Sequence, residues 1–148
     1  MYHSNNPILI LTIFAWLLFV SCEKSEPITI SNEEFSLDLW SGWTFQTRIG
    51  YDSYVGLFTN GYQEIEIDYG MYGFQNIYAI QETAETVYFE ETTVDGFPAK
   101  IRKNNSSEGT ILSFYIDKGN GYDMCILRVR NSENDERYIA IFKTFHFL

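Results

Sequence analysis

Apolar and polar residues alternate along much of the chain after residue 34, with the two-residue period of half-buried β-strands. The alternation is clear in residues 35–39 and again in residues 43–47, and Ser41 and Gly42 between them favour a turn. We therefore expect the folded domain to begin with a strand, a turn and a second strand.

A dipeptide that favours tight turns, Asn60-Gly61, lies between two further alternating segments. A type I′ hairpin turn needs positive φ at both central residues, and Asn and Gly tolerate it. A two-residue turn here pairs Thr59 with Tyr62. The same register directs the isoleucines of this segment to the core face of the sheet and its carboxylates to the opposite face.

Asp95-Gly96 predicts a second turn of the same type, between strands at residues 86–94 and 97–103. The register that follows places Glu91 opposite Lys100, and opposite charges in a cross-strand pair are favourable.

A third hairpin is predicted where the segment TILSFYID meets YDMCILRVR through a Gly-rich turn. A turn of four residues sets Phe114 opposite Cys125 and Leu112 opposite Leu127. All four side chains then lie on one buried face of the sheet.

Two stretches interrupt the alternating pattern. Residues 71–85 fit either a loop with a short helix or an irregular strand, because glycines at their start favour a loop. Residues 104–110, with the sequence NNSSEGT, predict a surface loop.

The apolar period changes to that of a helix near the C-terminus. Residues recurring at the positions i, i+3, i+4 and i+7 are Tyr138, Ile141, Phe142 and Phe145. Ser132 or Asn134 can cap this helix, and residues 145–147 alternate again as a short terminal strand. The elements together predict an α+β fold, in which an antiparallel sheet of six to seven strands is flanked by one or two helices, including a C-terminal helix.

An apolar run in residues 8–20, followed by Ser21 and Cys22, distinguishes the N-terminus. As a helix it spans roughly 20 Å, less than the hydrocarbon core of about 30 Å, so it resembles the hydrophobic part of a signal peptide. A small residue followed by Cys resembles the lipobox of bacterial lipoproteins, in which the Cys is acylated. We expect a lipoprotein signal peptide at residues 1–21, a lipid-anchored tether at residues 22–34 and a single domain at residues 35–148. A secretory signal in which Cys22 has no role, or an uncleaved anchor, are the alternatives.

Charge narrows the range of partners. The net charge is −10, and every Asp, Glu, Lys and Arg lies after Ser21. Nucleic acid is therefore excluded as an expected partner, because phosphate backbones repel an acidic chain. Attachment to a membrane is expected through acyl chains, while a basic partner or a divalent cation stays open.

Candidates for chemistry are few. Once the signal peptide is removed and Cys22 is acylated, Cys125 is the free thiol that is left and His146 is the remaining His. Strand phase places Cys125 in the core and His146 on the surface. Glu64, Glu66 and Asp68 share one strand face at a spacing of about 6.8 Å, which suits an acid/base pair, a cation site or simply a solvated face. We favour the solvated face, and predict no catalytic, cofactor or metal site.

Several short segments resemble small lipoproteins of Bacteroidota with a PsbP-like domain: DSYVG at residues 52–56, DYG at 68–70, VDG at 94–96 and IFKTFHF at 141–147. The resemblance implies an antiparallel sheet flanked by helices, in a group of mostly non-catalytic binding or assembly factors. It also implies a lipid anchor at Cys22, carrying acyl chains such as palmitate, in the outer membrane.

The expected function is accordingly that of a non-enzymatic cell-envelope lipoprotein, a binding or assembly module. Its expected partner is an envelope protein, bound by exposed Tyr and Trp side chains together with carboxylates. The alternative is a carboxylate-dependent hydrolase that acts on an envelope glycan, which requires two acids converging in a cleft.

Overall fold

The structure, a computed structural model, describes residues 26–50, 53–70 and 76–148. The elements in chain order are β1 (Pro27–Ser31), β2 (Phe35–Trp40), β3 (Thr44–Arg48), β4 (Tyr54–Thr59), β5 (Glu64–Tyr69), the 3-10 helix η1 (Ile77–Ala79), β6 (Thr86–Val94), β7 (Phe97–Ser106), β8 (Gly109–Asp117), β9 (Met124–Arg130), α2 (Asp135–Phe142) and β10 (His146–Phe147). Expected signal residues 1–21 and Cys22 lie outside the described part of the chain.

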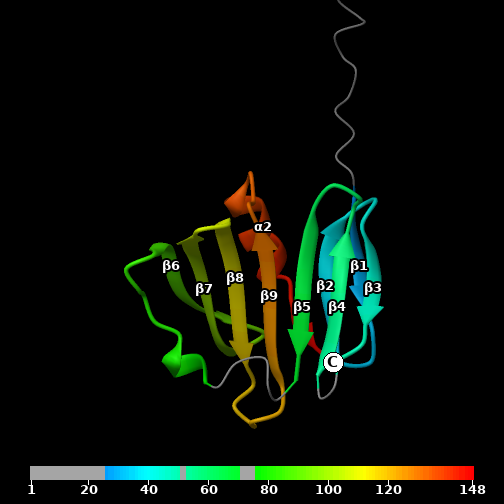
Figure 1. The fold of residues 1–148 in the computed structure, drawn as a ribbon. Helices are drawn as coiled ribbons and strands as arrows, with labels where there is room; N and C mark the ends of the chain where they lie inside the picture. The colour runs from blue at the N-terminus through cyan, green and yellow to red at the C-terminus, as the bar shows by residue number, and fades with distance from the viewer. Residues whose placement is uncertain (1–25, 51–52, 71–75) are drawn as a thin grey trace, which may run out of the picture.

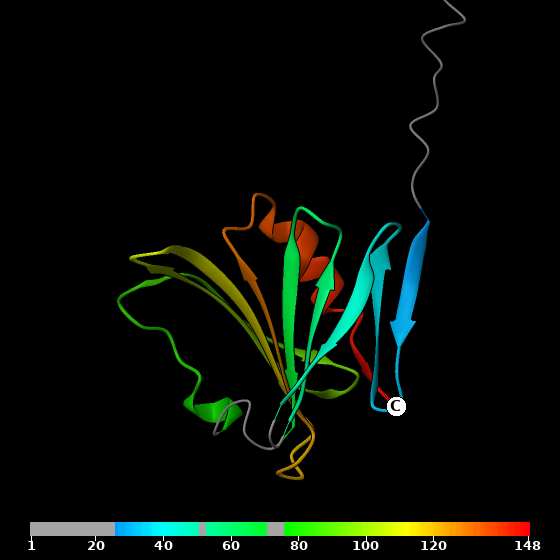
Figure 2. The same cartoon turned by 45° about the vertical axis from the view of Figure 1, so that its right-hand side comes forward.

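The strands form two antiparallel sheets. The large sheet has seven strands in the order β3-β4-β5-β9-β8-β7-β6, and the small sheet has three in the order β1-β2-β10. Figures 1 and 2 show the small sheet and α2 on the same face of the large sheet. We call this the inner face and the opposite one the outer face. The predicted antiparallel sheet with a C-terminal helix is confirmed, and the small sheet is an addition to it.

The core fills the space between the inner face, the small sheet and α2. Phe35 on β2 lies at its centre, and five aromatic rings approach this ring to centroid distances of 5.7 to 6.4 Å. The predicted core residues Leu112, Phe114, Cys125 and Leu127 are all fully buried here. Alternation within each strand thus gave the correct face for every one of these residues.

The register predicted at Asn60-Gly61 is wrong by two residues. Thr59 pairs with Glu64 instead of Tyr62, so the loop contains four residues. The Asn60 side chain accepts hydrogen bonds from the backbone N–H groups of Tyr62 and Gln63, at 3.0 and 2.9 Å. This side-chain turn replaces the two-residue turn.

The third hairpin shows the same kind of shift. Phe114 pairs with Leu127, and Leu112 with Val129, because the connecting loop is two residues longer than predicted. Asn120 organises this loop by accepting hydrogen bonds from two backbone N–H groups. A shift of two residues leaves each side chain on its predicted face.

The surface loop predicted at residues 104–110 is also wrong. Strands β7 and β8 continue through most of it, up to the pair Ser106 and Gly109. Asn104 accepts a hydrogen bond of 2.8 Å from the Thr86 hydroxyl, which ties this end of β7 to β6. β6 pairs with β7 as far as Asn104, and β8 pairs with it as far as Ser106. These partner strands satisfy backbone groups that a loop would leave to water.

The Asp95-Gly96 turn is confirmed, with positive φ at both residues and with Glu91 opposite Lys100. Of the uncertain stretch, residues 71–75 lie outside the described part of the chain, and residues 76–85 form a loop that contains η1. The C-terminal helix is confirmed too, and Asn134 is its cap.

The predicted start of the domain at residue 35 is too late. β1 pairs with β2 along its whole length, from Pro27 opposite Trp40 to Ser31 opposite Ser36. The expected tether at residues 22–34 therefore contains a strand of the folded domain. Pro27 is compatible with β1 because the strand lies at the edge of the small sheet, where a missing N–H is tolerated.

Candidate functional site

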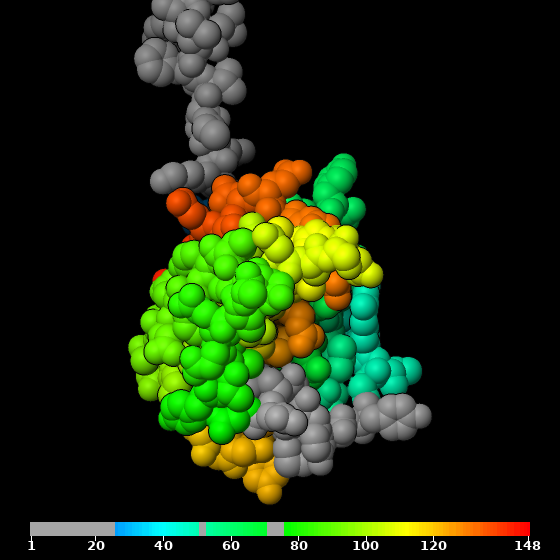
Figure 3. All heavy atoms as spheres, turned by 60° about the vertical axis from the view of Figure 1, so that its left-hand side comes forward, coloured from blue at the N-terminus to red at the C-terminus, as the bar shows by residue number. Residues whose placement is uncertain are grey.

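A smaller hollow opens on the outer face of the large sheet and adjoins a larger one, which continues from this face past the strand ends to the start of α2. Figure 3 shows β9, in orange, recessed between the green segment before and in β6 and the teal to green strands β3 to β5. The smaller hollow has a volume of about 220 Å³ and the larger one about 630 Å³. Arg128 and Arg130 line both hollows, so the two form one continuous site.

Strand register builds the smaller hollow. Arg102 on β7, Ser113 on β8 and Arg128 on β9 are successive cross-strand neighbours, and Glu66 on β5 follows next to Arg128. Neighbouring strands lie about 4.8 Å apart, so the Cα atoms of the two arginines are about 10 Å apart. The small Ser113 side chain between them leaves the depression.

Arg102 is held in place at the edge of this hollow. Its guanidinium donates to the Gln81 carbonyl at 2.9 Å and to the Tyr115 hydroxyl at 3.3 Å. It also lies over the Tyr115 ring, 5.7 Å from the centroid. These contacts fix its orientation without using any carboxylate.

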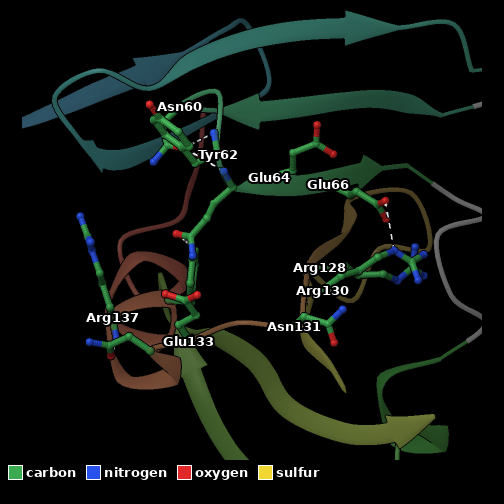
Figure 4. A pocket seen from close by; sticks show the side chains of 12 residues that line it. Asn60, Tyr62, Glu64, Glu66, Arg128, Arg130, Asn131, Glu133 and Arg137 are labelled. Atoms are coloured by element: carbon green, nitrogen blue, oxygen red, sulfur yellow. Dashed lines mark hydrogen bonds and ion pairs between the residues drawn. The ribbon is translucent and has the colours of Figure 1, made fainter. Parts of the chain in front are cut away.

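The larger hollow lies between the β4–β5 loop, β9 and the start of α2. Figure 4 shows Glu66 turned toward Arg128 and Arg130, whereas the Glu64 carboxylate points away from both arginines. Arg130 Nε is 3.6 Å from the Glu66 carboxylate. The other lining residues are Asn60, Tyr62, Gln63, Asn131, Glu133, Asn134, Arg137 and Tyr138.

The wall of the larger hollow is rigid where α2 meets the β4–β5 loop. The Tyr138 hydroxyl donates to the Gln63 side chain, and Asn60 fixes the loop backbone as described above. Burial of Tyr138 raises the pKa of its hydroxyl, which keeps this donor protonated. Tyr62, by contrast, is 96% exposed at the rim.

The three acids predicted on one strand face have different environments. Glu64 is exposed and Glu66 is partly exposed, as expected for a solvated face, and both also line the larger hollow. Asp68 follows on the same strand, and its Oδ1 is buried without a hydrogen-bond partner among the described residues. Within residues 26–50, 53–70 and 76–148, no group of three or more His, Cys, Asp or Glu side chains is arranged to hold a metal ion.

Cys125 and His146 are not brought together. Cys125 is fully buried on the inner face, and this burial raises the pKa of its thiol well above the usual range. His146 is on β10, where its Nδ1 lies 3.1 Å from the Asp95 carboxylate. The expected positions, Cys125 in the core and His146 at the surface, are both confirmed.

The Tyr and Trp side chains were expected to be exposed, and this expectation is met only in part. Tyr62, Tyr78 and Tyr122 are exposed, but Trp43 is buried. Trp40 is partly buried beneath Arg137, whose guanidinium lies 3.7 Å from the ring centroid. The described tryptophans are therefore occupied within the domain.

Sequence reasoning missed the arginines of this site. Arg128 and Arg130 alternate with buried residues of β9 and so share its outer face, a pattern visible in the sequence LRVR. Their proximity to Arg102 and Ser113 depends on the register of three strands, which the sequence alone did not specify.

No protein-family model and no curated protein matches this sequence. Among solved structures, the chain is similar to cyanobacterial PsbP (CyanoP) from Synechocystis sp. PCC 6803, determined in solution. The TM-score is 0.55 at 12% identity, over 86% of this chain and 96% of that chain. The chain has a PsbP-like fold. At this identity the likeness concerns the PsbP-like fold alone. Separately, none of the helices in the described ranges is long and apolar enough to span a membrane.

Proposed function

We propose that this chain is a non-enzymatic binding or assembly module of a bacterial cell envelope, anchored in the outer membrane through acyl chains on Cys22. The observation that carries the binding role is the continuous outer-face site. It combines arginines, carboxylates and side-chain amides with the exposed Tyr62 ring. Aromatic and arginine side chains contribute much of the binding energy at interfaces, and complementary charges steer association.

The anchor is tested by the variant Cys22→Ala. Acylation of Cys22 predicts that this variant is released from membranes or accumulates unprocessed, and that it no longer incorporates a fatty-acid probe. Cys125→Ala is the control, since its buried thiol is not the proposed acylation site. Equal labelling of wild type and Cys22→Ala contradicts the anchor.

The short distance from anchor to domain limits which surfaces are available to partners. Pro27, the first residue of β1, follows Cys22 by five positions, with four residues between them. Five fully extended steps along the chain reach at most about 18 Å. The domain therefore stays close to the membrane surface, and we expect the partner there as well.

A pull-down from solubilised membranes tests the binding role. We expect the wild-type chain to recover a stoichiometric partner whose binding weakens with salt, because the site is rich in charge. Tyr62→Ala should reduce recovery. Tyr78→Ala removes an exposed Tyr outside both hollows and serves as the matched control. Equal recovery by all three proteins contradicts this site as the binding surface.

One observation favours a second candidate, a carboxylate-dependent hydrolase of an envelope glycan. Glu64 and Glu66 both line a concave site instead of a convex face. The purified chain would then release reducing ends from an envelope glycan, and Glu66→Gln would abolish this release. Asp117→Asn, which alters a carboxylate outside both hollows, is the control. Binding of a glycan without any release supports the module instead.

A further inference from the structure

The outer-face site concentrates positive charge in an acidic protein. The chain has a net charge of −10 and contains five arginines. Four of these line the two hollows: Arg102, Arg128, Arg130 and Arg137. Three of the four, Arg102, Arg128 and Arg130, surround the smaller hollow, and none of the described residues that line it is a carboxylate.

Two polar groups of the smaller hollow have no partner within the described part of the chain. The Ser113 side chain belongs to a residue that is only 5% exposed, and its hydroxyl makes no hydrogen bond there. The Arg128 guanidinium forms no ion pair or hydrogen bond with any described residue either. Arg128 is partly exposed, and the Ser113 oxygen is not among the described side-chain atoms that are both inaccessible and unpartnered. Both groups line an open hollow, so water can satisfy them in the free protein, and a ligand that accepts hydrogen bonds can replace this water.

We propose that the smaller hollow binds the phosphate group of a phosphate monoester. This inference rests on the proposed binding function and names the ligand chemistry of the same site. The guanidinium groups of Arg102 and Arg128 donate to phosphate oxygens from the two sides, and the Ser113 hydroxyl donates from the floor. Planar guanidinium groups suit this role because each one can donate two parallel hydrogen bonds to an oxyanion.

Charge favours phosphate over a carboxylate. Three arginine cations surround the smaller hollow, and Glu66 is the carboxylate that pairs with one of them, Arg130. The local excess of about two positive charges matches a phosphate monoester, which carries roughly −1.5 to −2 at pH 7. A carboxylate would leave one arginine uncompensated.

The volumes of the two hollows suit the two parts of a phosphate monoester. The smaller hollow, about 220 Å³, corresponds to roughly seven water volumes and accommodates a phosphate group. The larger hollow, about 630 Å³, begins at the same arginines and takes the organic part of the monoester. Its amide and carboxylate side chains can bind hydroxyl groups, and Tyr62 offers an aromatic surface at the rim.

Titration of the chain with inorganic phosphate, followed by amide NMR shifts, tests the proposal. We expect saturable shifts at residues of β8 and β9 that surround Ser113 and Arg128. Arg128→Gln should weaken binding roughly tenfold or more, because it removes charge-assisted hydrogen bonds. Arg48→Gln makes the same change in net charge outside both hollows, and should leave binding unchanged.

Two further comparisons identify the source of the phosphate. Binding of glucose 6-phosphate more tightly than inorganic phosphate, and lost in Arg128→Gln, assigns the site to a soluble or saccharide-linked phosphate. Arg128-dependent binding to vesicles that contain phosphatidic acid, compared with vesicles of phosphatidylcholine alone, assigns it to a lipid headgroup. Either result supports the proposal.

Three outcomes overturn it: no saturable shifts at millimolar phosphate, equal affinities for phosphate and acetate, or equal losses in Arg128→Gln and Arg48→Gln. The binding function fails separately. A partner that Arg128→Gln still recovers in the pull-down, without any phosphate binding, would leave the module intact and reject its phosphate ligand.

Discussion

The two faces of the large sheet use the same strands for opposite purposes. On β9, Cys125, Leu127 and Val129 enter the aromatic core, while Arg128 and Arg130 between and after them line the outer hollows. Inner-face residues pack against the small sheet and α2, whereas the charged part of the outer face has no covering layer in the described structure. A shift of one residue along the strand thus separates core residues from residues that line the hollows, so substitutions on the two faces should have effects of different kinds.

The largest effect is expected for Phe114→Ala on the inner face. Phe114 is fully buried and stacks on Phe142 at 5.5 Å between ring centroids. Removal of a buried Phe ring typically costs about 3 to 5 kcal/mol of unfolding free energy, through lost transfer energy and the cavity left behind. Urea denaturation monitored by circular dichroism measures this loss.

Glu64→Ala on the outer face is the control, and we expect a change within about 0.5 kcal/mol because Glu64 is exposed. A cost for Phe114→Ala as small as that of the control would contradict the assignment of the inner face as the core.

A smaller loss is expected for Gly56→Ala, also on the inner face. A Cβ at this position would lie 2.4 Å from the Phe45 ring, which packs directly against the glycine. Overpacking of this kind costs about 1 to 3 kcal/mol, and we expect the lower part of this range because Phe45 is only partly buried. Thermal unfolding measures it.

The double variant Gly56→Ala with Phe45→Leu distinguishes a steric clash from a backbone effect. Relief of the clash predicts that the double variant loses less stability than the sum of the two single variants. Strict additivity would show that the ring does not cause the loss.

Sequence alone predicted the faces of the strands better than their pairing. Side chains alternate with a period of two, so the predicted hairpins at Asn60 and before Cys125 could each slip by two residues without moving any side chain to the other face. The slips arose because Asn60 and Asn120 form side-chain hydrogen bonds that lengthen the loops. Such capping is difficult to infer from a turn dipeptide.

The outer site was less accessible to prediction than the core. Glu64 and Glu66 were identified as candidates because they share one strand, which is local information. Arg102, Ser113 and Arg128 meet only when three strands are paired in the correct register. The small sheet was missed for the same reason, since nothing near Pro27–Ser31 specifies its pairing with β2.

A pH-dependent effect of about 1 kcal/mol is expected for Tyr69→Phe, at the end of β5. The Tyr69 hydroxyl donates a hydrogen bond of 2.7 Å to Asp123, and this bond is the main cause that lowers the pKa of the Asp123 carboxyl. A lowered folded-state pKa contributes stability above the unfolded pKa of about 3.9, and this contribution disappears as the pH falls below it. The variant should therefore be less stable than wild type at pH 7, with the difference narrowing toward pH 2. Urea titrations at both pH values measure it, and a difference independent of pH would contradict the role of Asp123.

The smallest change in stability is expected for Ser113→Ala, and it has the opposite sign. Residue Ser113 is only 5% exposed, and its hydroxyl makes no hydrogen bond to a described residue, so the folded protein gains little from this group in the free state. Its removal should leave the unfolding free energy unchanged or raise it by up to about 1 kcal/mol. The same variant should bind phosphate more weakly, because the floor of the smaller hollow loses its donor. Ser106→Ala is the control, since the Ser106 hydroxyl donates to the Gly109 carbonyl and its loss should destabilise the β7–β8 turn slightly. Urea denaturation with and without phosphate separates the two effects. If Ser113→Ala were destabilised while its phosphate binding stayed unchanged, the Ser113 hydroxyl would have a structural role, like the inner-face residues, and would not be part of the proposed phosphate site.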